Sequence, residues 1–193
     1  LAFLTDYGYI VYSSEFIIDF GAPERFRCNI QKMMEIGKKG VLALLCESSY
    51  SKNDGYTSPK HKLTDKIESI FEDATGRIII SSYAQNAFRT QEIAQLAKKY
   101  NRKICFYGRD KYDNTNTIMR IARHTKKPIL DIHPSYIADS KAISDKKNMG
   151  KLVVLLSGSP RRIYHDILDI IDGGDDKLKL QDSDTFIVAS PVL

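Results

Sequence analysis

Cysteines and long apolar runs are both scarce in this sequence, and their scarcity excludes several classes of protein. The three cysteines, Cys28, Cys46 and Cys105, are too few and too scattered for a disulfide framework or a zinc knuckle. No apolar run reaches the roughly 18 residues that a membrane span needs. We therefore expect a globular protein of the reducing cytoplasm. Because the chain opens at Leu1 directly in strand-like sequence, we also expect it to be part of a longer chain.

Motifs for common catalytic and metal sites are missing as well. The four histidines share no metal-ligand spacing, and no Ser-His-Asp or Cys-His arrangement can be argued. No glycine-rich fingerprint follows the first strand of the alternating region, which argues against a Rossmann-like nucleotide-binding domain. We therefore assign no catalytic residue to this chain. Cys46 and Cys105 lie within apolar runs, LALLC and KICFY, where we expect buried and unreactive thiols.

The charge of the chain is basic and unevenly distributed. A net charge of +5 and a pI near 9.0 permit a polyanionic partner without requiring one. Basic residues cluster between residues 98 and 111, and acidic residues cluster between residues 166 and 176. Such polarisation is common in nucleic-acid-binding proteins, although a mildly basic enzyme without nucleic acid is the alternative.

Apolar runs that alternate with amphipathic helices predict the fold. A hairpin over residues 1–12 and a short helix over 30–36 come first. From Val41 onward the predicted strands are 41–45, 77–83, 103–107, 128–132, 151–156 and 185–190. Helices between them predict an α/β fold with a mainly parallel sheet flanked by helices. The continuous apolar run 41–45 is expected to be covered on both faces.

Ligands of parallel sheets bind beyond the carboxyl ends of the strands, so the residues there are the candidate site. Polar or basic residues follow four of the predicted strands: Glu47, Asn86, Arg89, Arg109, Ser157, Gly158, Ser159, Arg161 and Arg162. The segment SGSPRR opens a helix, where free amides and the helix dipole attract anions and arginines add charged donors. A tight turn capped by Ser159, with solvated arginines, is the structural alternative. Basic residues at three neighbouring strand ends favour phosphate binding.

Five segments, in order, carry a resemblance to a known family: MMEIGKKGVLALLCESS, GRIIISSYAQNAFRTQEI, NRKICFYGRD, KLVVLLSGSP and DTFIVASPVL. Together they resemble the ribonuclease J family of metallo-β-lactamase nucleases around its β-CASP domain. MMEIGKKGVLALLCESS is similar to the family's entry into the first β-CASP strand, and GRIIISSYAQNAFRTQEI to its second strand and helix. NRKICFYGRD, KLVVLLSGSP and DTFIVASPVL are similar to three later elements. The resemblance implies a β-CASP domain over residues 41–183. Residues 1–40 would then end the first metallo-β-lactamase segment, and residues 184–193 would return to that domain.

The resemblance also implies a two-metal zinc site, and this chain contains one of its expected ligand positions. Glu15 in VYSSEFIIDF stands where the family has a metal-binding aspartate, and Glu47 stands at an acidic β-CASP position. Phe88 replaces a family histidine, and GSPRRI replaces the family's GSQGEP. These departures imply a degenerate paralogue whose metal site is incomplete within this chain.

The function implied is part of a cytoplasmic RNA-processing or RNA-degrading zinc hydrolase. This piece would hold RNA phosphates through Arg89, Arg109, Arg161 and the turn of Ser157, Gly158 and Ser159. The alternative is a non-catalytic RNA-binding or assembly subunit that partners an active ribonuclease J. RNA is the expected partner, with a homo-oligomer or a hetero-oligomer with a paralogue as a further expectation, and no membrane.

Overall fold

The computed structural model describes residues 1–14, 16, 18–20, 24, 27–48, 51–52, 54–55, 63–83, 86–108, 124 and 130–189. The chain divides into two compact units, Leu1–Lys62 and Leu63–Leu193, and each is described by itself. Glu15 and Arg109 of the expected site lie outside the described residues, as does the helix expected around residues 118–122.

In its described residues, the first unit contains a three-stranded sheet and a helix. Strands β1 (Ala2–Thr5) and β2 (Gly8–Ser14) form the expected antiparallel hairpin, and β3 (Val41–Cys46) pairs with β2 in parallel. Gly8 has a φ of +124°, and a Cβ there would lie 3.2 Å from the Gly40 carbonyl oxygen, so the turn favours glycine. Helix α1 (Ile30–Lys38) connects β2 to β3 and begins at Asn29, whose side chain accepts a 2.9 Å hydrogen bond from the Lys32 amide.

The apolar side chains of β3 are exposed, so the prediction of a strand covered on both faces is wrong for the described structure. Leu42, Leu44 and Leu45 are each more than half exposed, and Cys46 is exposed rather than buried. The physical reason is local: no described residue of the first unit is buried, and α1 contributes none. An apolar run predicts a strand here, but it does not by itself supply the layers that would cover it.

The second unit is built on a four-stranded, all-parallel sheet. Strands β4 (Ile78–Tyr83), β5 (Lys103–Tyr107), β6 (Leu152–Gly158) and β7 (Thr185–Val188) lie in the order β5-β6-β4-β7. The sheet with its flanking helices confirms the predicted α/β class. Because all four strands run the same way, their carboxyl ends meet at one edge of the sheet.

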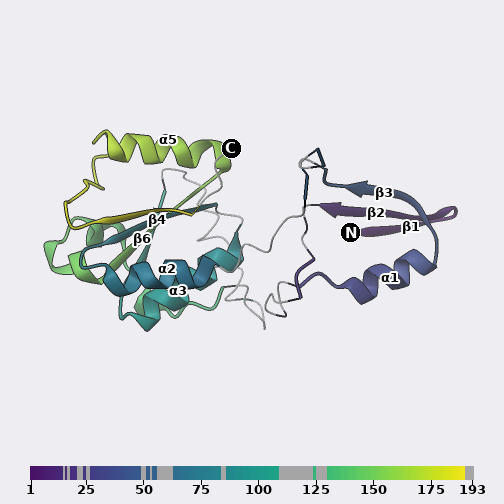
Figure 1. Cartoon of the computed structure of the whole chain (residues 1–193), viewed down its shortest axis with the longest axis horizontal. Helices are drawn as coiled ribbons and strands as arrows, with labels where there is room; N and C mark the ends of the chain where they lie inside the picture. The colour runs from purple at the N-terminus through teal and green to yellow at the C-terminus, as the bar shows by residue number, and fades with distance from the viewer. Residues whose placement is uncertain are drawn as a thin grey trace. The chain divides into compact units, whose positions relative to one another are not determined.

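Helices cover both faces of this sheet (Figure 1). Helices α2 (Thr64–Asp73) and α3 (Ala87–Lys99) pack on one face, and α5 (Pro160–Ile171) packs on the other. Successive residues of a strand point to opposite faces, and β4 shows this alternation. Ile78 and Ile80 join the core beneath α2 and α3, whereas Ile79 joins the core beneath α5.

Two buried arginines hold the amino edge of the sheet. Arg77 is 1% exposed; it donates to Asp184 Oδ1 at 2.9 Å and to the carbonyls of Ile143 and Lys179, both at 2.7 Å. Arg102 is 5% exposed and donates to the carbonyls of Gly76 and Ala74. Carbonyl and carboxylate acceptors therefore satisfy both guanidinium groups inside the protein, as buried charges require.

The strand predicted over residues 128–132 is wrong for the part that the structure describes. Leu130 is buried at 4% exposure, yet residues 130–132 form no strand. The side-chain amide of Gln91 takes the place of a neighbouring strand. Its oxygen accepts from the Asp131 amide at 2.7 Å, and its nitrogen donates to the Asp131 carbonyl at 3.3 Å. The backbone N–H and C=O of Asp131 are thus satisfied without sheet pairing.

The compact units have different boundaries from the predicted domains. The division falls after Lys62, whereas the sequence indicated a boundary after residue 40. Strand β3 pairs with β2 of the first unit, and β7 pairs with β4 of the second. The assignment of residues 1–40, 41–183 and 184–193 to named domains of the family stays a prediction.

Candidate functional site

The carboxyl edge of the second sheet brings together the ends of three strands. Within the register, Ser82 of β4 faces Ser157 of β6, Tyr83 faces Gly158, and Tyr107 of β5 faces Leu156. A Cβ on Gly108 would lie 2.7 Å from the Ser157 carbonyl oxygen, so the end of β5 reaches β6 this closely because residue 108 is glycine. The geometry shows that the carboxyl ends of β4, β5 and β6 lie side by side at this edge.

Ser157, Gly158 and Ser159 form the turn from β6 into α5. Ser157 and Gly158 end the strand, Ser159 is the residue before the helix, and Pro160 occupies the first helical position. The Ser159 carbonyl accepts from the amides of Arg162 and Ile163 at 3.1 and 3.0 Å. Its side chain makes no capping hydrogen bond to the residues that the structure describes. The cap expected in the structural alternative is therefore not formed by the hydroxyl.

An open hollow of about 560 Å³ lies beside the first turns of α5. It is lined by two arginines, a histidine, two carboxylates and a serine: Ser159, Arg161, Arg162, His165, Asp166 and Asp169. Arg161 and His165 are exposed and four residues apart, which places them on the same helical face. Arg161 forms no ion pair with any described residue, so its guanidinium is available to an anion at the end of β6.

Arg89 lies in the first turn of α3, as predicted, but it is buried. It is 5% exposed, and its guanidinium forms an ion pair with Glu92. Glu92 also accepts a hydrogen bond from Thr64 of α2. The backbone amide of Arg89 donates at 3.0 Å to the side chain of Asn86, which caps α3. Glu92 was missed in the sequence, although its spacing of three residues from Arg89 on a helix is the usual signal for such a pair.

Ser82 is a further residue that the sequence did not single out. It is 1% exposed, and its hydroxyl has no hydrogen-bond partner among the described residues. Ser82 and its register partner Ser157 point to the face covered by α3, because both continue the alternation that buries Ile80 and Leu155 there. A buried hydroxyl without a hydrogen-bond partner lowers the free energy of unfolding by about 1–3 kcal/mol. We therefore expect a partner for the Ser82 hydroxyl beyond the described residues, such as a water molecule or a ligand.

Asp175 organises the loop that follows α5 at the same edge. Its carboxylate accepts from the Tyr107 hydroxyl at 2.8 Å and from the amides of Lys177 and Leu178 at 2.9 and 2.8 Å. Part of the acidic cluster noted in the sequence is thus structural. Cys105, inside the sheet, is buried as predicted, and burial raises the pKa of its thiol to about 11.

The described residues do not fit a metal pair. Within the ranges given above, no group of three or more His, Cys, Asp or Glu side chains is placed to hold a metal ion. Glu47 is exposed and follows β3 in the first unit, and Glu15 lies outside the described residues. The metal role of Glu15 therefore stays a prediction.

Residues 75–193, more than half of the chain, match the family model described as "Ribonuclease J, beta-CASP domain". The chain belongs to this ribonuclease J family. The match includes the whole four-stranded sheet with α3 and α5, so the strand-end loops described above lie within the family's β-CASP domain. The resemblance inferred from the sequence segments is confirmed.

Curated relatives support the ribonuclease J assignment. "Ribonuclease J 2" of Staphylococcus saprophyticus subsp. saprophyticus is 38% identical over 105 residues, and "Ribonuclease J 2" of Staphylococcus aureus is 37% identical over 105 residues. Each match spans 54% of this chain but only 19% of the relative. The family is one of RNA-processing nucleases by its name. In the part of the chain that the structure describes, no helix has the length and apolarity needed to cross a membrane.

Proposed function

We propose that this chain supplies an RNA-phosphate-binding wall of a ribonuclease J-like RNA-processing hydrolase. The observation that carries the proposal is the turn of Ser157, Gly158 and Ser159, which leads from β6 into α5 beside Arg161, an exposed residue with no ion pair to the described residues. Amides at the start of a helix and the positive end of its dipole attract a phosphate. A guanidinium beside them adds charge-assisted hydrogen bonds.

The predicted residues contribute to this wall in different ways. Arg161 can contact a phosphate directly, because the guanidinium is exposed and free of ion pairs to described residues. Arg89 would contact a phosphate only by exchanging its partner Glu92. Arg109 remains a proposed contact on the loop after β5. Contacts of this kind hold the RNA backbone without reading its sequence, and their strength falls with salt.

The metal chemistry of the intact hydrolase is proposed from the family alone. A zinc pair would be completed by segments beyond this chain, with Glu15 as the position contributed here. We therefore assign RNA binding, and no cleavage step, to these 193 residues. Cytoplasmic location and assembly with further copies or a paralogue are part of the same proposal.

A non-catalytic RNA-binding or assembly subunit is the second candidate. Three substitutions favour it: Glu15 and Glu47 stand where the resemblance places aspartates, and Phe88 stands where it places a histidine. Glutamate extends the carboxylate by one methylene, which disturbs the close spacing of a two-metal site. The two candidates share the RNA-binding wall and differ in whether the complete protein cuts RNA.

The test is binding of a fluorescently labelled single-stranded RNA oligonucleotide, measured by anisotropy over a range of salt concentrations. We expect Arg161→Ala to weaken binding by about fivefold to tenfold, and to lower the slope of log affinity against log salt by about one. Lys177→Ala, which also removes one exposed positive charge from the second unit, is the matched control and should retain nearly full affinity.

Equal affinities of Arg161→Ala and the unmodified chain would refute the proposed wall. The same samples, supplied with zinc or manganese, should leave the RNA intact over the course of the titration. Robust cleavage that is absent from a mock preparation would contradict the inference that these residues lack a complete metal site.

A further inference from the structure

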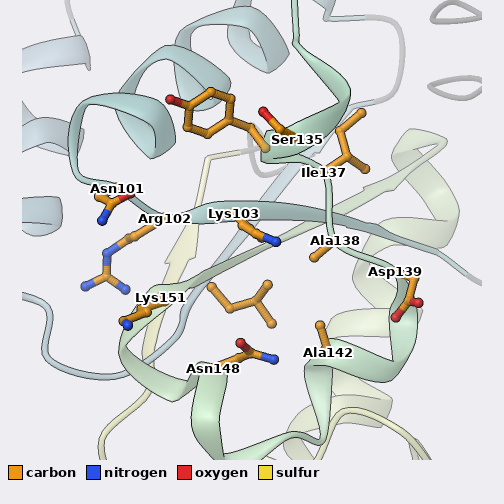
Figure 2. A pocket seen from close by; sticks show the side chains of 12 residues that line it. Asn101, Arg102, Lys103, Ser135, Ile137, Ala138, Asp139, Ala142, Asn148 and Lys151 are labelled. Carbon is orange, nitrogen blue, oxygen red and sulfur yellow. The ribbon is translucent and has the colours of Figure 1, made fainter.

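A second hollow, of about 550 Å³, lies at the amino ends of β5 and β6 (Figure 2). Its walls come from the start of these strands and from the 3-10 turns Pro134–Tyr136, Ser140–Ile143 and Lys146–Lys151. The volume falls within the roughly 300–1,000 Å³ that small-molecule sites occupy. The hollow therefore has room for one small ligand.

This hollow is separate from the proposed RNA-binding wall. Strand β6 runs from Leu152, which lines the hollow, to Gly158, which belongs to the wall. At about 3.3 Å per residue, the two ends lie about 20 Å apart. One nucleotide cannot contact both places, so we treat the hollow as a binding site separate from the RNA-binding wall.

Two lysines bring positive charge to the lining of the hollow. Lys103 begins β5 and Lys151 precedes β6; the register places Lys103 opposite Leu152, the neighbour of Lys151. Neither lysine forms an ion pair with any residue in the described ranges. Arg102, which also lines the hollow, is already held by backbone carbonyls. Among the positive charges that line the hollow, the ammonium groups of Lys103 and Lys151 are therefore the ones available to bind an anionic ligand.

The rest of the lining is mixed in a way that suits a phosphorylated, hydroxyl-bearing molecule. Figure 2 shows Lys151 and Asp139 on opposite sides of the hollow, with the Asn148 amide between them. Ala138 and Ala142 supply apolar surface. Asp139 Oδ1 already accepts from the Lys141 amide at 2.9 Å, so an anionic group beside the lysines would leave Oδ2 of Asp139 to accept from hydroxyl groups at the far side.

We propose that this hollow binds a nucleoside monophosphate, with its phosphate between Lys103 and Lys151 and its ribose hydroxyls toward Asp139. Two solvated lysines on a flat surface would need no ligand, since exposed charges are well hydrated. Here they stand at a concave pocket that also holds a carboxylate, an amide and the ring of Tyr136. The Lys98 ammonium already lies 5.8 Å from the centroid of that ring, so a base would stack on the other face of the ring.

The test is calorimetric titration of the 193-residue chain with adenosine monophosphate, inorganic phosphate and adenosine. We expect saturable binding of the nucleotide, weaker binding of phosphate and no saturable binding of adenosine. The double variant Lys103→Glu/Lys151→Glu should weaken nucleotide binding by at least about tenfold. Lys66→Glu/Lys177→Glu makes the same change in net charge at exposed positions outside the lining and should stay within about twofold.

Amide chemical shifts locate the binding event. Nucleotide should shift the amides of Ala138 and Asn148, and Lys103→Gln/Lys151→Gln repeats the test with smaller perturbation should the glutamate variant fail to fold. Unchanged affinity in a folded lysine variant overturns the proposal, as does equal binding of adenosine. A short RNA that binds through these lysines when the nucleotide does not would also overturn it. The Arg161→Ala variant should retain nucleotide binding even where it loses RNA affinity. The two proposed sites can therefore succeed or fail independently.

Discussion

The arginines of the second unit perform different tasks that depend on their depth. Arg77 and Arg102 are buried, and each donates to backbone carbonyls that join segments distant in the sequence. Burial lowers the pKa of Arg102 from its ordinary value, yet an arginine keeps its charge at neutral pH. Arg89 is buried against Glu92, and Arg161 is exposed. Accessibility and partners, more than position at a strand end, make Arg161 the first candidate for an external phosphate.

The three thiols are expected to react at different rates. Cys105 is 1% exposed with its pKa raised to about 11, whereas Cys46 is exposed and Cys28 is half-buried. A thiol reagent at pH 8 should therefore label two thiols quickly, and the third only after denaturant is added. A Cys105→Ala variant should keep the fast phase and lose the slow one. Three equally fast thiols in the native chain would contradict the buried position of Cys105.

The raised pKa of Cys105 also sets a direction for stability against pH. In the unfolded chain this thiol ionises near its ordinary value of about 8.5. The contribution of the neutral, buried thiol is therefore complete below that pH, and it is lost as the pH rises toward the folded pKa of about 11. Alkaline unfolding of Cys105→Ala should accordingly be less steep in this range.

At the scale of elements, a single side chain replaces part of a strand. Gln91 of α3 makes both hydrogen bonds with the backbone of Asp131, which a neighbouring strand would otherwise supply. We expect Gln91→Leu to leave these two backbone groups unpaired and to destabilise the unit by about 1–3 kcal/mol. Urea denaturation measures the loss, and Gln181→Leu, at an exposed position, is the control. Hydrogen exchange at Asp131 should accelerate in the first variant and not in the second.

Periodicity and composition predicted most of the elements, because each buried element repeats its apolar residues at its own spacing. The run RIIISSY predicts β4, and the apolar residues Ile163, Ile167, Leu168 and Ile171 predict α5. Ile163 and Ile167 are buried as expected, whereas Leu168 and Ile171 are each more than half exposed and Ile170 is buried in their place. The prediction of a strand over 128–132 was wrong because Leu130 is buried in the core without belonging to a sheet. The side chain of Gln91 satisfies the Asp131 backbone in place of a neighbouring strand. Likewise Arg89 marks a strand end in the sequence, and its pairing with Glu92 could have been predicted from their spacing on α3. The burial of that pair beside Thr64 of α2 could not, because it depends on the packing of α2 against α3.

At the scale of the whole molecule, the two units differ in how much they bury. The second unit holds two apolar cores on opposite faces of its sheet, whereas no described residue of the first unit is buried. We expect the amides of β4 and β6 to exchange at least about a hundredfold more slowly than those of β1, β2 and β3. Native-state hydrogen exchange followed by NMR measures this directly. Comparable protection in both sheets would show that the first unit is stabilised as strongly as the second.

The sequence could indicate the fold class but not the division into units. An apolar strand such as β3 has the same composition whether it joins one sheet or another, and only its pairing with β2 assigns it to the first unit. The same holds for β7, whose pairing with β4 places it in the second unit. Strand pairing joins residues that are far apart in the sequence. The local pattern of apolar residues in a strand therefore does not predict which strand it will pair with.

The strand order β5-β6-β4-β7 has a consequence for synthesis on the ribosome. The neighbours of β4 are β6 and β7, which begin at Leu152 and Thr185, so both edges of β4 stay unpaired while roughly the next 70 residues are translated. At about 5–20 residues per second this interval lasts several seconds. The nascent chain thus carries an isoleucine-rich strand, with both edges open, for longer than many small domains take to fold. Protection of that strand by a chaperone would matter most during this interval.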